Sequence, residues 1–271
     1  MKVAETRSPG PALRRRMPGA RVLRDGTVLY WWVEIIAILV FYLVYSRIRN
    51  ANGNDPAAAF DHAKQIINWQ RSLGIYHEQT LQSWALHFRP LIVFCNYWYG
   101  SMHFVVTIGV MVFLYRKWSD DYPTWRNTLG IATAIALIGF TLYPLMPPRL
   151  LPAHFGFDPL THYTTFWTIS GVKSISNQFA AMPSVHCAWA LWCACALVPR
   201  LKRTWAKWLA GIYPLITLVA IVLTANHYFL DAVVGYAVLG VAAILARAFT
   251  RAGRGPAKEN RLSAADGPAV A

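Results

Sequence analysis

Four polar residues beside long apolar segments have the types and the spacing for chemistry: Arg149, His186, His227 and Asp231. Polar side chains are costly in a bilayer, so those within or next to apolar segments indicate function. His227 and Asp231 lie four residues apart, and on a helix such residues share a face and can form a hydrogen bond. A carboxylate that binds one imidazole nitrogen leaves the lone pair of the other nitrogen available. The pair therefore predicts a histidine nucleophile.

The other two polar residues complete this chemistry. The string Pro183-Ser184-Val185-His186 places a second histidine in the first turn of an expected helix, where backbone N–H groups favour a phosphate. Ser184 can cap that helix or donate to a phosphate oxygen. The guanidinium of Arg149 offers a planar fork for phosphate oxygens. A nucleophile, an acid, an orienting carboxylate and an anion clamp together predict phosphoryl transfer.

The elements that carry these residues are expected to be membrane helices. The chain of 271 residues is 56% hydrophobic and only 14% charged, which is below the ~25% typical of soluble domains. We predict an all-α, polytopic membrane bundle of six transmembrane helices. The predicted spans are residues 28–46, 90–115, 128–146, 183–199, 209–225 and 228–246. The membrane domain thus covers residues 28–246, between a basic N-terminal tail (1–27) and a disordered C-terminal tail (247–271).

Loop charge predicts the orientation. Most of the 26 Lys and Arg residues lie in the two tails and in the connections after the second and fourth predicted spans. The positive-inside rule makes that side cytoplasmic, with both termini. The four chemistry-bearing residues then face outward, and we expect the plasma membrane as the location. The net charge of +14 fits anionic lipid, and with no nucleic-acid motif we expect no nucleic-acid partner.

The first outer connection, residues 50–89, contains an amphipathic stripe. Leu81, Trp84, Ala85 and Phe88 follow the spacing i, i+3, i+4, i+7. This predicts an amphipathic helix at the outer face, which either lies in the membrane interface or packs on the bundle as a lid. The second outer connection, residues 147–182, is expected to be a loop.

The paired motifs also resemble a known family. The strings Pro-Ser-x-His and His-x3-Asp, with Arg149 preceding them, resemble the type-2 phosphatidic acid phosphatase superfamily over roughly residues 30–246. The inositol phosphorylceramide synthase-like branch is the more similar one. The residues that suggest this branch are Tyr143 to Arg149, Asn226 to Asp231, Glu78 to Trp84, Asn96, Tyr99 and His103.

The resemblance implies roles for the site residues. His227 would attack phosphorus and form a phosphohistidine, with Asp231 orienting it. His186 would protonate the leaving alkoxide, and Arg149 would hold the phosphoryl oxygens. The residues of a possible substrate pocket are Asn96, Tyr99 and His103. The resemblance implies neither a metal nor another cofactor.

The chain departs from the superfamily pattern at three places. Leu142 stands where a lysine is expected, Leu150 where a proline follows the arginine, and Ala220 and Ile221 where Ser-Arg is expected. Two phosphate-binding cations are thus absent, which favours a phosphodiester over a dianionic monoester.

We therefore expect a transferase that moves a phosphoryl-bearing head group from a phospholipid to a lipid or alcohol acceptor. The alternative is a lipid phosphate phosphatase, of the phosphatidic acid or polyprenyl phosphate type, with water as acceptor. A remote alternative is a proton-coupled transporter, which the lack of an internal repeat disfavours.

Overall fold

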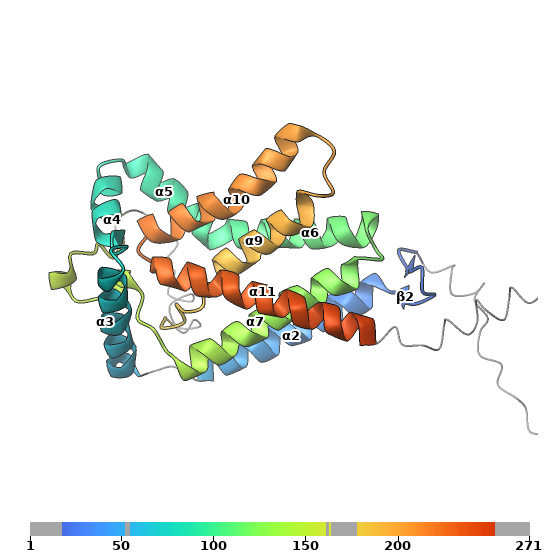
Figure 1. Cartoon of the computed structure of the whole chain (residues 1–271), viewed down its shortest axis with the longest axis horizontal. Coiled ribbons are helices and arrows are strands. Elements are labelled where there is room, and N and C mark those ends of the chain that lie inside the picture. Colours follow the sequence, from blue (N-terminus) through green and yellow to red (C-terminus); the bar gives the residue numbers. More distant parts are fainter. Residues whose placement is uncertain (1–17, 52–54, 161–162, 164–177, 253–271) are drawn as a thin grey trace, which may run out of the picture.

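The computed structural model of the chain describes residues 18–51, 55–160, 163 and 178–252, and these are mostly helical (Figure 1). The α-helices in chain order are α2 (Trp31–Ala51), α3 (Pro56–Ser72), α4 (Glu78–Leu86), α5 (Arg89–Tyr97), α6 (His103–Lys117), α7 (Tyr122–Leu142), α9 (Val185–Leu197), α10 (Thr204–Leu223) and α11 (Phe229–Ala252). A π-helix, η1 (Trp98–Met102), joins α5 to α6. Two 3-10 turns, η2 (Pro148–Leu150) and η3 (Ala153–Phe155), follow α7.

Four described segments are long and apolar enough to cross a membrane: Trp31–Arg49, Arg89–Lys117, Thr204–Leu223 and Phe229–Thr250. The chain is therefore an integral membrane protein, but the predicted count of six spans is not confirmed. The fourth predicted span is shorter than expected, because α9 has 13 residues and a helix needs about 20 to cross the hydrocarbon core. The third corresponds to α7, which has 21 residues but carries Arg126 and Asn127 in its first two turns.

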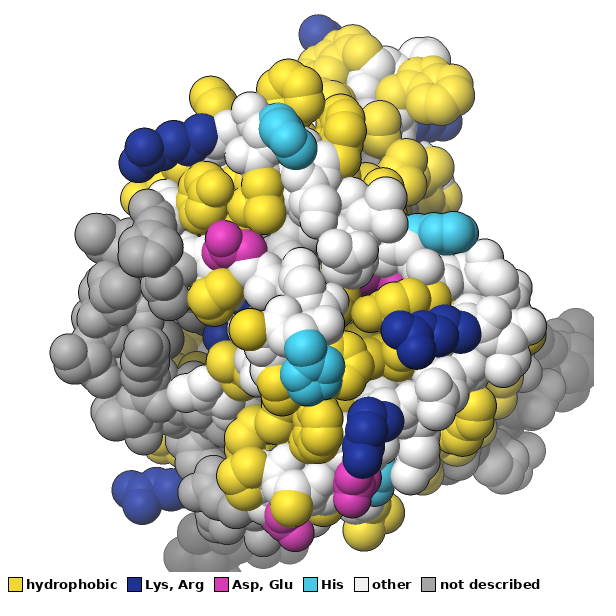
Figure 2. All heavy atoms as spheres, turned by 90° about the vertical axis from the view of Figure 1, so that its left-hand side faces the viewer, with side chains coloured by type: hydrophobic (Ala, Val, Ile, Leu, Met, Phe, Trp, Pro, Cys, Tyr) yellow, Lys and Arg dark blue, Asp and Glu magenta, His cyan; other side chains and the backbone are white. Residues whose placement is uncertain are grey.

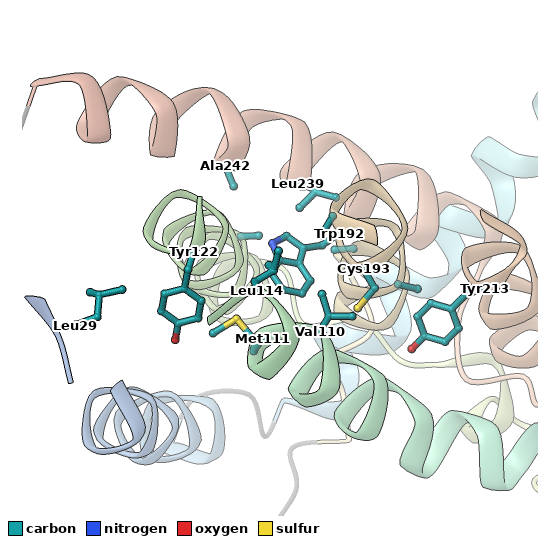
Figure 3. Close-up of a cluster of buried hydrophobic side chains, with 14 of the residues drawn as sticks. Leu29, Val110, Met111, Leu114, Tyr122, Trp192, Cys193, Tyr213, Leu239 and Ala242 are labelled. Carbon is teal, nitrogen blue, oxygen red and sulfur yellow. The ribbon is translucent and has the colours of Figure 1, made fainter. Parts of the chain in front are cut away.

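Helix α9 lies at the centre of the bundle, packed against α6, α7, α10 and α11. This position explains why α9 is apolar on all sides. Its Trp192 and Cys193 are fully buried, and they pack with Leu114 of α6 and Leu239 of α11 in a hydrophobic core (Figure 3). The core fixes the direction of α9. His186 is the second residue of this helix.

The two ends of the bundle differ. In Figure 1, α3 and α4 lie across the left end, where α9 and α11 begin. The right end holds the C-terminal end of α11 and a short antiparallel hairpin of β1 (Arg21–Val22) and β2 (Val28–Leu29). This right end is called the basic end below, and the left end is called the site end.

The first outer connection contains two helices where the sequence predicted one. Helix α3 begins at Pro56, and the carboxylate of Asp55 caps it by accepting from the N–H groups of Ala57 and Ala58, both at 3.0 Å. The buried face of α3 comprises Ala59, Ala63, Ile66, Ile67 and Gln70. A Pro after a capping Asp and this spacing of small and aliphatic residues are the sequence signals that identify α3.

Part of the predicted amphipathic stripe packs on the bundle, and part of it is exposed as in a membrane-interface helix. Ala85 of α4 is fully buried and Leu81 packs on the bundle, as a lid would. Trp84 and Phe88 are instead exposed and lie against each other, with ring centroids 5.3 Å apart. Figure 2 shows the site end face-on, with hydrophobic side chains exposed among cationic ones. Exposed aromatic side chains of this kind are typical of a membrane interface.

Candidate active site

His227 and Asp231 are in contact at the start of α11. His227 Nδ1 lies 3.2 Å from Asp231 Oδ2, and the same oxygen accepts the backbone N–H of Tyr228 at 3.0 Å. Asp231 is fully buried and His227 is 3% exposed. A carboxylate next to Nδ1 holds the proton on that nitrogen and leaves the lone pair of Nε2 for a substrate. The spacing of four residues thus brings the two side chains into contact, as the sequence predicted.

Two residues that the sequence did not assign to the site hold the start of α11. Phe229 N donates to Glu78 Oε1 and Leu230 N donates to Gln70 Oε1, both at 2.9 Å. Gln70 Nε2 also donates to Glu78 Oε1, and both side chains are fully buried. Helix N-termini leave unpaired N–H groups that stabilise carboxylates. Helices α3 and α4 therefore cap α11 from outside, directly after His227.

The second histidine, His186, lies in the first turn of α9. Ser184 is the N-cap of this helix, and its buried hydroxyl accepts the N–H of Cys187 at 3.4 Å. The backbone N–H of Ser184 donates to the carbonyl oxygen of Asp231 at 2.9 Å, which joins the start of α9 to α11. The ring centroids of His186 and His227 are 5.6 Å apart. Both histidines of the predicted site therefore meet at one place.

Glycine makes this junction possible. A Cβ atom added at Gly235 of α11 would lie 2.5 Å from the carbonyl oxygen of Ser184. A Cβ atom added at Gly139 of α7 would lie 2.6 Å from Cδ of Pro183. Real Cβ atoms do not approach so closely, so the two glycines let α7 and α11 close on the turn before His186.

Arg149 reaches the site from η2, beside the turn that precedes His227. Its N–H donates to the carbonyl oxygen of Ala225 and its Nε donates to Asn226 Oδ1, both at 2.8 Å. Ala225 has a φ of 50°, in the left-handed region. Burial lowers the pKa of the Arg149 guanidinium, while its interaction with Tyr99 opposes this shift. The guanidinium remains protonated at physiological pH.

The segment before Arg149 is fixed on two sides. Met146 N donates to the carbonyl oxygen of Ala59 in α3 at 3.1 Å. The carbonyl oxygen of Met146 accepts the hydroxyl of Tyr228, also at 3.1 Å. Burial raises the pKa of that hydroxyl, so Tyr228 stays a neutral donor. The position of Arg149 thus depends on the same outer helices as that of His227.

The predicted pocket residues come from α5, η1 and α6. The ring of Tyr99 stacks on that of His186 with centroids 4.2 Å apart, and the ring of His103 lies 4.3 Å from that of His186. His103 Nδ1 lies 3.0 Å from the carbonyl oxygen of Tyr99. π-helices are rare and occur mostly at functional sites. Asn96 is fully buried, and its Nδ2 donates to the carbonyl oxygen of Ile92 within its own helix at 3.1 Å.

The arrangement can perform nucleophilic substitution at phosphorus. His227 lies deepest, whereas His186, Tyr99, His103 and Arg149 are only partly buried. Among the described residues, no three His, Cys, Asp or Glu side chains cluster in a way that could hold a metal ion. The residues brought together are an imidazole in contact with a carboxylate, a second imidazole and a guanidinium, which are the groups that such a substitution needs.

A family model described as the PAP2 superfamily matches residues 64–245. The chain belongs to this superfamily. No curated protein and no solved structure is significantly similar to it. Membership in the PAP2 superfamily supports a lipid phosphatase or phosphotransferase activity in general, and the match contains all four residues from which the sequence argument began.

The chain lacks charge at the departures from the superfamily pattern. Leu142 is 76% exposed at the end of α7, and Ala220 and Ile221 of α10 are fully buried. Leu150, which takes the place of the expected proline, lies in η2 after Arg149 and packs on a hydrophobic cluster. None of these positions gives this PAP2 site a second cation.

Proposed function

We propose that the protein is a lipid phosphotransferase that moves a phosphoryl-bearing head group from a phospholipid to a lipid or alcohol acceptor. The observation that carries the proposal is the meeting of two imidazoles, His227 held by Asp231 and His186 with its ring centroid 5.6 Å away. One imidazole can act as nucleophile and the other as acid and then base.

The proposed reaction has two steps. In the first, Nε2 of His227 attacks phosphorus, the bond from phosphorus to the lipid alkoxide breaks, and His186 donates a proton to the alkoxide. The product is a phosphohistidine that carries the head group. In the second, His186 removes a proton from the acceptor hydroxyl, whose oxygen attacks phosphorus while the N–P bond breaks. Asp231 holds the His227 tautomer, and Arg149 stabilises charge on the phosphoryl oxygens.

A transferase is favoured over a phosphatase by the surroundings of the nucleophile. His227 is 3% exposed, and Tyr99 and His103 pack on the His186 ring with centroids at 4.2 and 4.3 Å. Exclusion of water suppresses hydrolysis of a reactive intermediate. Two phosphate-binding cations of the superfamily pattern are absent, which favours a phosphodiester donor. This supports the inositol phosphorylceramide synthase-like branch over a phosphatidic acid phosphatase.

Product analysis tests this function. Purified protein in mixed phospholipid micelles would receive an isotope-labelled ceramide or diacylglycerol acceptor, and the products would be measured by mass spectrometry. We expect a labelled acceptor that carries the head group and its phosphate, together with the dephosphorylated lipid of the donor. Release of inorganic phosphate or water-soluble phosphate esters alone, with no labelled product, would identify the protein as a hydrolase.

The proposed location is the plasma membrane with the site facing outward. The described ends of the chain lie at the basic end of the bundle, opposite α3 and α4 (Figure 1). This arrangement agrees with cytoplasmic termini and an outward-facing site. Reporter fusions would test the orientation. A fusion after Ser46 should read extracytoplasmic and one after Tyr115 cytoplasmic, and reversed labelling would turn the site inward.

A further inference from the structure

A pocket of about 500 Å³ lies between the β1–β2 hairpin and helix α6 at the basic end of the bundle. Figure 1 shows this hairpin at the opposite end from α3 and α4. The volume falls in the range of pockets that bind small molecules. Three cations and three uncharged residues of α6 line the pocket: Arg21, Arg116, Lys117, Gly109, Val112 and Phe113. The proposed phosphoryl transfer uses none of them.

The hairpin that carries Arg21 is fixed against α6. The hydroxyl of Tyr115 in α6 donates to the carbonyl oxygens of Gly19 and Leu29, at 2.8 and 3.1 Å. Leu29 is the strand partner of Arg21, and its side chain is buried in the main hydrophobic core. The backbone around Arg21 is therefore held beside the last turn of α6, which carries the other two cations of the pocket.

The three cations of the pocket form no ion pair with a carboxylate in the described part of the chain. Other cations at the same end do, since Arg126 and Arg200 each pair with a carboxylate at 2.6 Å. Nε of Arg21 is buried, and it has no hydrogen-bond partner among the described residues. A buried donor without a partner is costly. An anion bound in the pocket would supply the missing acceptor and balance the three charges.

The uncharged wall of the pocket continues along a surface of α6 that lipid would cover. Val105, Ile108 and Val112 follow the spacing i, i+3, i+7, which places them on one face of the helix, and all three are exposed. A Cβ atom added at Gly109 would meet no atom within 4 Å, so this glycine leaves open space beside them. A ligand with an anionic group and a long apolar chain would therefore contact both parts of the pocket.

We propose that this pocket binds an anionic phospholipid of the membrane leaflet at the basic end. Its phosphate would lie among the three cations, and one acyl chain would follow the exposed face of α6. A free phosphate would leave the apolar wall uncovered, and a zwitterionic lipid would bring a further cation. Residues 1–17 of the chain are a poor occupant by charge, because they contain five Lys and Arg residues and one acidic residue.

The bound lipid would link the hairpin to α6 and stabilise the folded protein, because a ligand that binds only the folded state raises its stability. The pocket takes no part in the proposed reaction, so the inference goes beyond the proposed function and does not depend on it. Binding and thermal unfolding therefore test it without an activity assay.

Native mass spectrometry of the purified full chain in detergent would measure the affinity for phosphatidylglycerol, with phosphatidylcholine and inorganic phosphate as comparison ligands. We expect the combined variant Arg21→Gln/Arg116→Gln/Lys117→Gln to bind phosphatidylglycerol roughly 100-fold more weakly, because each cation near an anionic lipid contributes about fivefold. The matched control is Lys202→Gln/Arg203→Gln/Lys207→Gln, which removes three exposed cations outside the pocket. The control should bind this lipid like the wild type.

Gly109→Leu tests the apolar wall without a change in charge. The added side chain enters open space, so the protein should fold normally but lose affinity for phosphatidylglycerol. The matched control is Gly211→Leu in α10, an exposed glycine whose added Cβ atom would also meet no atom within 4 Å. Unchanged lipid binding by Gly109→Leu would contradict the assignment of an acyl chain to this wall.

Thermal unfolding separates a lipid site from a structural cluster of cations. Phosphatidylglycerol should raise the melting temperature of the wild type by a few degrees and that of the combined variant much less. Without lipid, the combined variant should melt no lower than the wild type, because it loses no ion pair. A lower melting temperature without lipid would overturn the inference, since the cations would then be structural. Equal lipid binding by the combined variant and its control, or equal protection by inorganic phosphate, would overturn it as well.

Discussion

Both ends of the bundle contain charged residues, but they arrange them differently. At the basic end, Nη1 of Arg126 lies 2.6 and 2.7 Å from the two carboxylate oxygens of Glu34, and Tyr122 donates to Oε2 of Glu34 at 3.1 Å. Arg200 pairs with Asp121 at 2.6 Å. These cations and carboxylates neutralise each other, and the pairs link α2 to α7 and α7 to the end of α9.

In the candidate site, the two buried carboxylates bind groups other than arginine. Asp231 and Glu78 bind an imidazole and backbone N–H groups. Nε of the Arg149 guanidinium donates to the amide oxygen of Asn226, and the backbone N–H of Arg149 donates to the carbonyl oxygen of Ala225. Pairing of opposite charges fits a structural role, whereas separation leaves the cationic side able to stabilise an anionic substrate. Substitutions at the two ends should therefore fail in different ways.

The largest effect is expected at the nucleophile. His227→Ala should abolish turnover on every donor and leave no trappable phosphoenzyme. His186→Ala should lose ~10²–10⁴-fold on a natural lipid, the usual value of acid–base catalysis, and much less on a nitrophenyl ester, whose leaving group needs no proton. Asp231→Asn should fall between the two, because the imidazole remains but its tautomer is no longer fixed.

Steady-state rates on the two donors, together with chemical trapping of labelled enzyme, measure this difference. Label at His227 should be stable in base and labile in acid. Equal rescue of both histidine variants by the nitrophenyl donor, or label on His186, would mean that the two roles are reversed.

A smaller effect is expected from the residues that cap α11. Gln70→Leu removes the acceptor of the Leu230 N–H and a donor to Glu78. An unpaired buried group costs about 1–3 kcal/mol, and here it loosens the turn that carries His227. We expect a lower melting temperature and a lower kcat together. The matched control, Gln65→Leu, changes an exposed glutamine of the same helix, and an equal loss there would show that α3 tolerates no apolar substitution.

At the basic end, stability and activity should separate. Glu34→Gln weakens a pair whose side chains are 9% and 32% exposed for Glu34 and Arg126. Arg126 can still reach water, so the free energy of unfolding should fall by about 1–2 kcal/mol. Larger losses are typical of charged hydrogen bonds that are more fully buried. The protein that remains folded should keep its wild-type kcat. A fall in kcat without a fall in melting temperature would contradict the separation of the two ends.

The sequence predicted the contact between His227 and Asp231 more directly than it predicted the membrane spans. His227 and Asp231 are only four residues apart, so one helical turn determines their contact, and this local rule holds at 3.2 Å. The count of six spans is not confirmed, because hydropathy does not reveal that α9 begins only after its N-cap, Ser184, and has only 13 residues. A short central helix surrounded by other helices is as apolar as a full span.

The contacts that hold the start of α11 escaped the sequence argument. The bond from Leu230 N to Gln70 joins residues 160 positions apart, and no local pattern pairs them. The residues that carry the family resemblance include Glu78, but their positions in the sequence gave no reason to expect that its side chain is buried.

The smallest effect is expected from metal removal. In the proposed mechanism His227 supplies the nucleophile without a metal-bound hydroxide, and Arg149 supplies positive charge at the phosphoryl oxygens. Activity on a phosphodiester lipid should therefore remain within about twofold of its starting value after dialysis against EDTA, and added Mg²⁺ should raise it no further. The comparison sharpens in the Arg149→Ala variant, in which a divalent cation could occupy the position of the lost guanidinium and restore part of the rate. A strict requirement of the wild type for a divalent ion, lost on chelation and restored on its return, would instead make His227 and Asp231 metal ligands. The separation of charges at the site end would then reflect a cation site and not a phosphate site.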